Sequence, residues 1–471
     1  MNLPENFVSY TENLLGKEPF SQLSDALMAE PPVSVRLNAL KSGEPAGLEQ
    51  VPWCERGFYL PQRQPFTFDP LFHAGCYYVQ EAASMFLWQA VRQYVHKPVV
   101  ALDLCAAPGG KSTLLLDALP EGSLLVANEP IGNRASVLRE NIVKWGRHNV
   151  VVTNNYPKDF TSLPAMFDLV VADVPCSGEG MFRKDPHARE EWSREAVAHC
   201  QSRQRDIIRD VWKTLKPGGL LIYSTCTFNV EENEKNIAWI CQEMGAESLS
   251  LTTEPSWGVE RALWAGSREE VFRFFPHKTR GEGFFLSVLR KTDEEVTSMP
   301  WRSKRASAKD KWPKLLTQWL GEQDDLQMDS YKTGDGTIQY RAFPRRFAPQ
   351  LERMKRGLHI ILAGGELAEE RNGKLKPSHG LAMSCGLAKG IFPELSLTYQ
   401  DAIVYLRGET IELHHGIPKG MVLLSYQGHP IGFANQLGQR ANNMYPQAWR
   451  IKSTHLPAVE ERKGLDLFGP L

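Results

Sequence analysis

The sequence predicts an α/β protein whose core is a mostly parallel sheet with helices on both faces. Short apolar runs alternate with stretches in which apolar residues recur at helical spacing, such as 133–145 and 195–215. Strands that are apolar along their whole length are typical of a parallel sheet buried on both faces. Five runs have this character: VVALDL (99–104), SLLVAN (123–128), NVVVTN (149–154), FDLVVAD (167–173) and GGLLIYST (218–225). FFLSVLRK (284–291) predicts a further strand at the edge of the sheet.

The chain has 471 residues, 42% of them hydrophobic, which exceeds what one core usually supports, so we predict four domains. Residues 1–95 form an α+β cap, with helical spacing over 5–30 and 77–95 around the strand-like PPVSVRLNAL (31–40). Residues 96–292 hold the parallel sheet. Residues 293–385, which begin with the basic stretch WRSKRASAKDKWPK (301–314), form a linker and a small intermediate domain. Residues 386–471, with short apolar runs and many glycines, form a small and mostly β domain.

Composition excludes several classes of protein. The net charge is −1, so any affinity for nucleic acid has to come from local patches. No segment is long and apolar enough to span a membrane, and MNLPENFVSYTENLLGKEPF lacks the basic and apolar regions of a secretion signal, so we expect a cytoplasmic protein. The eight cysteines contain no CxxC pair, which argues against a disulfide framework or a zinc ribbon.

A loop of small residues follows the first strand of the sheet. In LDLCAAPGGKS, the paired Gly109 and Gly110 let the backbone approach a bound ligand closely, as at a nucleotide-type site. The second strand ends at Glu129, where a carboxylate accepts hydrogen bonds from the ribose hydroxyls of an adenosine. The loop comes close to the phosphate-binding motif GxxxxGK[ST], but Cys105 replaces the first glycine and the acid is no part of that motif. A nucleoside triphosphatase, or a turn without a ligand, is therefore the less favoured alternative.

Two cysteines follow neighbouring runs of the predicted sheet. Asp173 ends one strand and Cys176 comes three residues later, while Cys226 lies just past the end of the next strand. Ligands bind at the carboxyl edge of an open parallel sheet, where neighbouring strands are about 4.8 Å apart, so the three side chains can converge on one small ring. The other reading of a lone cysteine is an inert, buried apolar side chain, and it applies to Cys200, Cys241, Cys54 and Cys385.

These motifs resemble those of the RNA cytosine-5 methyltransferases, and most closely those of the bacterial 16S ribosomal RNA enzymes with a C-terminal PUA-like domain. The resemblance covers nearly the whole chain. It rests on PVSVRLNAL, YYVQEAASM, CAAPGGKS, ADVPCSGEGMFRKDP, YSTCTFNVEENE, GEGFF and GHPIGFANQLGQRANNMYPQAWRI. It implies a Rossmann-like, S-adenosylmethionine-dependent methyltransferase sheet between an N-terminal α+β RNA-binding cap and a C-terminal PUA-like RNA-binding domain.

The resemblance also implies roles for individual residues. The family's nucleophile falls on Cys226, the cysteine that assists product release on Cys176, and the acid that faces the base on Asp173. The S-adenosylmethionine site falls on Cys105, Ala106, Ala107, Pro108, Gly109, Gly110, Lys111, Glu129 and Asp173. A further contact, to the adenine, falls in VVVTNNYPKD, where we assign Asn155, with Asn154 and Asp159 as alternatives. No metal is implied.

The chemistry requires these residue types. Carbon 5 of cytosine is a poor nucleophile until a thiolate adds to C6 of the ring. A free cysteine is mostly protonated at neutral pH, so strand-end dipoles or a nearby cation have to favour the thiolate of Cys226; the sequence does not identify the cation. Asp173 faces N3 of the base, and Cys176 assists loss of the C5 proton. Lys111 either hydrogen-bonds in the pocket or is a solvated lysine of the helix start.

The target base has to leave its stack, which requires protein contacts to the flanking nucleotides. We expect such contacts from Arg183 and Lys184, and from RAFPRRF (341–347) and MYPQAWRIK (444–452), where basic and aromatic residues alternate. Gln80 and Glu81 either brace the site or lie solvated on a helix. The expected partner is 16S ribosomal RNA or the 30S subunit, with no membrane and no protein partner. Transfer RNA as substrate, and a non-catalytic ribosome assembly factor, are the alternatives.

Overall fold

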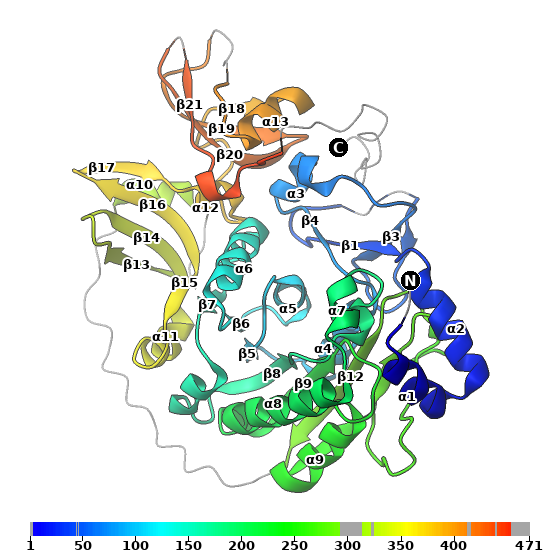
Figure 1. Ribbon diagram of the computed structural model, residues 1–471. Helices are drawn as coiled ribbons and strands as arrows, with labels where there is room; N and C mark the ends of the chain where they lie inside the picture. The colour runs from blue at the N-terminus through cyan, green and yellow to red at the C-terminus, as the bar shows by residue number, and fades with distance from the viewer. Residues whose placement is uncertain are drawn as a thin grey trace.

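A computed structural model describes residues 3–43, 45, 47–292, 313–321, 325–411, 416–438 and 440–453. It has a central nine-stranded sheet in the order β10-β12-β9-β8-β5-β6-β7-β15, with β11 paired to β12, which confirms the predicted fold class (Figure 1). The strands are β5 (Val100–Asp103), β6 (Leu124–Asn128), β7 (Val150–Thr153), β8 (Phe167–Asp173), β9 (Leu215–Thr225), β10 (Ala246–Leu249), β11 (Phe272–Phe274), β12 (Phe284–Lys291) and β15 (Ile360–Ala363).

The five strands from β9 to β7 are parallel, as their continuous apolar sequences predict. Strand β12 runs antiparallel to β9, and its other side pairs with β10 and β11. The prediction that 284–291 lies at the edge of the sheet is therefore wrong. The two short strands that cover it carry too few apolar residues to stand out in the sequence.

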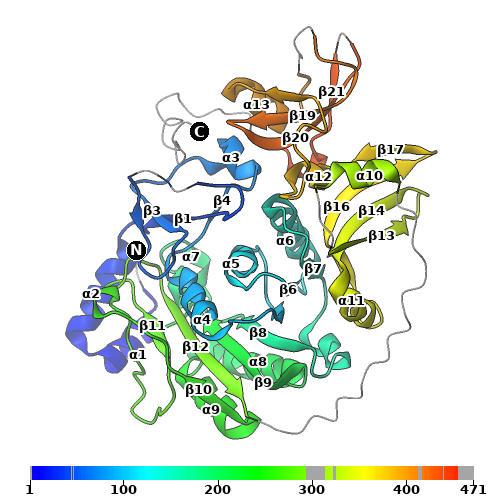
Figure 2. The same ribbon diagram turned by 180° about the vertical axis from the view of Figure 1, so that it is seen from behind.

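Helices cover both faces of the sheet (Figures 1 and 2). One apolar cluster joins Leu125 and Ala127 of β6 to three helices, α4 (Leu87–Tyr94), α5 (Gly110–Ala118) and α6 (Gly132–Trp145). The opposite cluster joins Leu124 and Val126 to α8 (Arg194–Trp212), α9 (Glu234–Met244) and α11 (Ala348–Met354). Successive residues of a strand thus serve the two faces in turn.

The N-terminal region is the predicted mixture of helices and strands. Helices α1 (Glu5–Leu15) and α2 (Lys17–Met28) meet at Gly16, whose φ of 88° breaks the helical run that we predicted over 5–30. They precede a four-stranded sheet, β2-β3-β1-β4, made of β2 (Glu49–Gln50), β3 (Gly57–Leu60), β1 (Val33–Leu37) and β4 (Tyr77–Val79), with α3 (Pro70–His73) before β4. The prediction of one helix over 77–95 is wrong at its start, because β4 pairs with β1 there.

The segment after the predicted linker returns to the central sheet. Strand β15 pairs antiparallel with β7. In the chain it lies between β14 and β16, which belong to a separate four-stranded sheet. That sheet consists of β13 (Leu326–Lys332), β14 (Ile338–Pro344), β16 (Gly365–Arg371) and β17 (Lys374–Pro377). Helices α10 (Lys314–Trp319) and α12 (His379–Met383) lie in the same region. Most of the basic stretch 301–314, namely 301–312, lies outside the described residues.

The last domain packs on the first (Figure 1). It holds α13 (Tyr399–Leu406) and the sheet β18 (Glu394–Ser396), β19 (Gly420–Tyr426), β20 (His429–Gln436) and β21 (Ala441–Asn443). One apolar cluster contains Val35 and Leu71 of the N-terminal region together with Tyr405 and Val422 of the terminal domain. The two ends of the chain therefore share a core. No helix of the described residues is long and apolar enough to cross a membrane.

Candidate active site

The two cysteines meet at the carboxyl edge of the sheet. Strands β8 and β9 are parallel neighbours, with Asp173 opposite Ser224, and each cysteine lies in the turn that follows its strand. The Sγ atoms of Cys176 and Cys226 are 3.3 Å apart, in contact as free thiols. The hydrogen bond between them, together with burial, raises the pKa of Cys176 well above its usual value.

Asp173 joins the cysteine edge to the predicted cofactor loop. One carboxylate oxygen accepts a hydrogen bond from Ser224 Oγ at 2.7 Å, and the other accepts from Lys111 Nζ at 2.8 Å. Burial alone lowers the pKa of Lys111, but the charges of Asp173 and its neighbours raise it above the usual value, so Lys111 is a cation at neutral pH. The Cys226 sulfur is among the groups whose charge acts on Lys111. Lys111 is thus a cation held at the cysteine edge of the sheet by Asp173.

The predicted cofactor loop runs from the end of β5 to the start of α5. Gly109 has a φ of 121°, a conformation that favours glycine, and α5 begins at Gly110. A side chain at Gly110 would meet the Tyr78 ring at 3.3 Å, so the loop packs tightly on β4. The segment before them, Cys105, Ala106, Ala107 and Pro108, lines the turn, and burial raises the pKa of the Cys105 thiol. That thiol is therefore an inert part of the wall.

Glu129 directly follows β6, beside this loop, and is 1% exposed. Its carboxylate accepts a hydrogen bond from the backbone N–H of Ile131 at 3.0 Å, and the Arg134 guanidinium lies 3.5 Å away. Arg134 also donates to the carbonyl of Ala107 at 3.0 Å. The arginine therefore ties the acid to the loop.

A third carboxylate lies under the loop. Asp103 is fully buried; one of its oxygens accepts from Ser112 Oγ at 2.6 Å, and the other has no hydrogen-bond partner among the described residues. Burial raises its pKa to about 7. A buried acceptor without a partner is costly, and Asp103, Glu129 and Asp173 together suit a ligand with positive charge. S-adenosylmethionine, with its ammonium and sulfonium groups, meets that requirement.

The three candidates for the adenine contact, which follow β7, all form hydrogen bonds within the protein. The side-chain amide of Asn155 donates to the carbonyl of His359 and accepts from its N–H, at 3.1 and 2.9 Å. Asp159 accepts from the backbone N–H of Tyr156 at 2.9 Å. Asn154 donates to the carbonyl of Glu129 at 2.7 Å. The predicted adenine contact thus lies where β7 meets the segment that leads into β15.

The basic and aromatic stretches differ from what we predicted. Phe343, Phe347 and Tyr445 are at most 8% exposed, so the prediction that the rings of 341–347 and 444–452 stack on bases is wrong for these three. They belong to the apolar clusters that join the domains. The alternation of basic and aromatic residues here is that of strands and turns with one buried side, where the aromatic rings named above lie.

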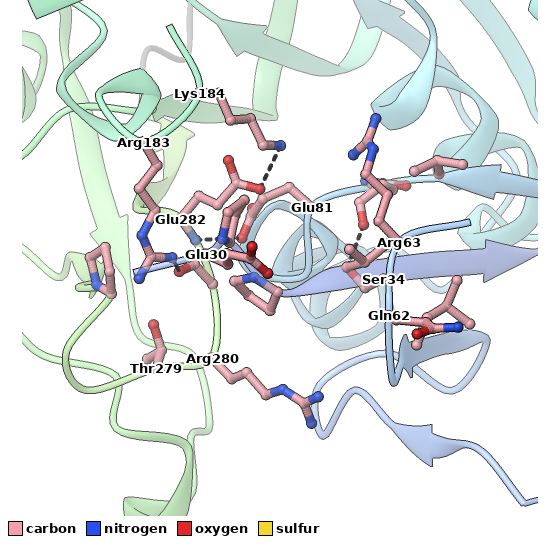
Figure 3. Close-up of a pocket in the computed structure, with 18 of the residues that line it drawn as sticks. Glu30, Ser34, Gln62, Arg63, Glu81, Arg183, Lys184, Thr279, Arg280 and Glu282 are labelled. Carbon is pink, nitrogen blue, oxygen red and sulfur yellow. Dashed lines mark hydrogen bonds and ion pairs between the residues drawn. The ribbon is translucent and has the colours of Figure 1, made fainter. Parts of the chain in front are cut away.

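A cavity of about 780 Å³ opens between the N-terminal sheet and the turn after Cys176 (Figure 3). Lys184 pairs with Glu282 at 2.6 Å at its rim, and Arg183 donates to the carbonyls of Ala26 and Gly281. Glu81 accepts hydrogen bonds from the N–H groups of Ala83, Ser84 and Glu282, while Gln80 accepts from Arg36. Gln80 and Glu81 therefore hold backbone and side-chain groups of the cavity wall, and a bracing role in the active site stays a prediction.

Sequence reasoning did not single out Asp103, Ser224 or Arg134. Asp103 carries a usable signal, because it is the acidic last residue of an otherwise apolar strand. Ser224 and Arg134 carry none, because a serine in a strand and an arginine on a helix surface are common in any protein.

The chain matches three protein families along its length. Residues 95–290 match the family described as 16S rRNA methyltransferase RsmB/F, residues 3–82 the N-terminal domain of 16S rRNA methyltransferase RsmF, and residues 392–451 the methyltransferase RsmF PUA domain. Ribosomal RNA small subunit methyltransferase F of Aliivibrio salmonicida (strain LFI1238) is 32% identical over 440 residues, which cover 88% of this chain and 90% of the relative. The protein of that name from Escherichia coli O81 (strain ED1a) is 30% identical over 451 residues, with coverages of 88% and 89%.

Solved structures show the same fold. A methyltransferase homolog protein from Pyrococcus horikoshii has a TM-score of 0.51 and 27% identity, covering 61% of this chain and 100% of its own. NSun6 from Pyrococcus horikoshii, solved with SFG, has a TM-score of 0.53 and 22% identity, covering 62% and 99%. The family match confirms the predicted resemblance and the use of S-adenosylmethionine, and the solved structures confirm the fold. The relatives are matched from the N-terminal region to the PUA domain, and the chain therefore belongs to the RsmF family of 16S rRNA methyltransferases.

Proposed function

We propose that this enzyme methylates carbon 5 of a cytosine in 16S rRNA through a reversible bond between Cys226 Sγ and C6 of the base. The observation that supports this most is the 3.3 Å contact between the Cys176 and Cys226 sulfurs beside the Lys111–Asp173 pair. Two thiols that share one proton have separable roles, because one attacks as the anion while the other remains protonated.

Lys111 and Asp173 prepare the attack. The Lys111 ammonium stabilises the thiolate of Cys226, and Asp173, held by Lys111 and Ser224, faces N3 of the base. Addition of the Cys226 sulfur to C6 places the electron pair on the ring and makes C5 a nucleophile. S-adenosylmethionine, when bound, supplies the methyl group as an electrophile attached to positive sulfur.

Cys176 acts after methyl transfer. Once Cys226 has bonded to carbon, the negative sulfur that held the proton on Cys176 is gone, and Cys176 ionises more readily. As a thiolate it takes the C5 proton, directly or through a water. The C5–H electron pair restores the ring double bond, and the C6–S pair returns to Cys226.

The cofactor site proposed for this reaction consists of 105–111, Glu129 and Asp103. Glu129 suits the ribose hydroxyls, and Asp103 suits a positively charged group. For the adenine we retain Asn155, whose amide would have to exchange its bonds with His359, and Asn154 is the alternative. The domain boundaries at 95, 292 and 385 also remain our proposal.

Small-subunit ribosomal RNA is the proposed substrate because the relatives that match over the whole chain are named for it. The test is methylation of 30S subunits and of naked 16S rRNA with labelled S-adenosylmethionine. Cys226→Ala should abolish transfer, and Cys176→Ala should accumulate a protein–RNA adduct that survives denaturing electrophoresis. Cys241→Ala, on α9, is the matched control and should behave as wild type. Full activity of Cys226→Ala, or transfer only to transfer RNA, would refute the proposal.

A further inference from the structure

Two buried carboxylates hold together the turns that carry Cys176 and Cys226. Each acid belongs to one turn and binds the backbone of the other. Glu179, three residues after Cys176, accepts hydrogen bonds from the backbone N–H groups of Phe228 and Asn229, at 2.5 and 3.0 Å. It also accepts from the Trp192 indole at 2.9 Å. Glu179 therefore holds the backbone just past Cys226.

Glu232 makes the reciprocal contact. It follows Cys226 by six residues and accepts from the backbone N–H of Ser177 at 3.1 Å, directly after Cys176. Gln204 of α8 donates to the same carboxylate at 2.6 Å. Each cysteine turn thus gives its backbone donors to an acid that the other turn supplies.

Asn229 connects the two acids. Its side-chain amide nitrogen lies 2.9 Å from a Glu179 oxygen and 2.8 Å from a Glu232 oxygen. The hydroxyls of Ser177 and Thr227, the residues next to the two cysteines, are 3.0 Å apart, and the Gly180 N–H donates to the Cys226 carbonyl at 2.7 Å. We call Glu179, Asn229 and Glu232 the carboxylate clamp.

The two acids of the carboxylate clamp are buried, and the partners of their hydrogen bonds described above are neutral groups. Glu179 and Glu232 are 1% and 0% exposed, and among the described residues neither forms an ion pair. Two unpaired buried carboxylates are costly, and hydrogen bonds with neutral partners offset the cost only in part. Burial and the charge of Glu179 raise the pKa of Glu232 to about 7, and the charge of Glu232 in turn adds to the raised pKa of Cys176. A neutral polar network would have held the turns without this cost.

We infer that the carboxylate clamp holds the two sulfurs in contact and that the charge of Glu232 keeps their shared proton on Cys176, so that the anion lies on Cys226. Glu232 binds the backbone beside Cys176, whereas the Lys111 cation acts on Cys226, so the two charges polarise the pair in one direction. Glu179, Asn229 and Glu232 are positioning residues. The inference rests on the proposed function, because it assigns the ionised sulfur to the proposed nucleophile.

The test compares how fast the two thiols of the full-length protein react with iodoacetamide, without RNA. Limiting reagent and mass spectrometry give the ratio of labelled Cys226 to labelled Cys176. Glu232→Gln should lower this ratio about tenfold, the factor that corresponds to one unit of relative pKa. Glu231→Gln is the matched control: it removes the same charge one residue away, where Glu231 pairs with Lys235, and should leave the ratio unchanged.

Glu179→Gln is the second variant and covers the case in which Glu232→Gln does not fold. Glu179 binds the backbone beside Cys226, so its loss removes negative charge from the side of the proposed anion. The labelling ratio should therefore rise, while kcat falls and the Kd for S-adenosylmethionine stays unchanged. An unchanged ratio in a folded Glu232→Gln or Glu179→Gln protein would overturn the inference, even if methylation were lost. The labelling ratio needs no RNA and no turnover. Activity of Cys226→Ala would therefore refute the proposed function without deciding the labelling result.

Discussion

Lys111→Met separates a catalytic role of the ammonium from a structural one. Lys111 and Asp173 are 17% and 31% exposed and 2.8 Å apart, so the ion pair adds about 1 kcal/mol or less to stability. The ammonium also lies 5.3 Å from the centre of the Phe284 ring, a contact that adds about 0.5–1 kcal/mol. We therefore expect the free energy of unfolding to fall by about 1–2 kcal/mol. Loss of one charged group that stabilises the reacting atoms costs about 10²–10³ in kcat.

The matched control is Lys216→Met. Lys216, on β9, pairs with Asp168 at 2.7 Å, with exposures of 39% and 32%; Asp168 lies at the end of β8 opposite to Asp173. Its loss should lower stability by a similar amount and leave methylation unchanged. Urea unfolding and single-turnover methyl transfer measure the two effects. Equal rates for Lys111→Met and wild type, or equal rate losses for both variants, would refute the reasoning that the Lys111 charge serves the reaction.

Three further predictions follow from the described contacts. Glu129→Ala should weaken binding of S-adenosylmethionine at least about tenfold, because a buried carboxylate that accepts charge-assisted hydrogen bonds contributes about 1.5–3 kcal/mol. An unchanged Kd in calorimetry would contradict this. Gly180→Ala should slow methylation with the fold retained, because its Cβ would lie 2.7 Å from the carbonyl oxygen of Cys226; wild-type kcat would contradict it. Burial lowers the pKa of His73 to about 3, so the folded state holds it neutral while the unfolded chain binds a proton below about pH 6.5. The contribution of His73 to stability should therefore be constant above about pH 6.5 and fall by about 2 kcal/mol between pH 6.5 and 5, and His73→Gln should remove this part of the slope in thermal unfolding.

The sequence predicted the central sheet because its strands are apolar on both faces and alternate with helical segments. It predicted the helix over 77–95 incorrectly at 77–79, where Tyr77 and Val79 align with Leu37 and Val35 of β1. Whether such a short segment forms a strand depends on a partner strand from another part of the chain. The local spacing of apolar residues carries no information about that partner. Strand β15 escaped prediction for the same reason.

Some features of the candidate site could be predicted from the sequence, and others could not. The convergence of Asp173, Cys176 and Cys226 follows from parallel strands that end at one edge, so spacing along the chain was sufficient to predict it. The role of Lys111 required the distance from α5 to β8, which only the tertiary structure provides. Glu179 and Glu232 carry no sequence signal of burial, because glutamates in polar turns are usually solvated.

Strand β15 has a consequence for the order in which the protein is built. The edge of β7 presents backbone donors and acceptors until residues 360–363 pair with it, and about two hundred residues of chain separate the two strands in synthesis. A nascent chain that has emerged only as far as β12 thus exposes an unpaired edge of the central sheet, a surface prone to association with other chains. Recombinant fragments that stop after the catalytic sheet, near residue 290, inherit the same open edge and should aggregate more readily than the full-length protein.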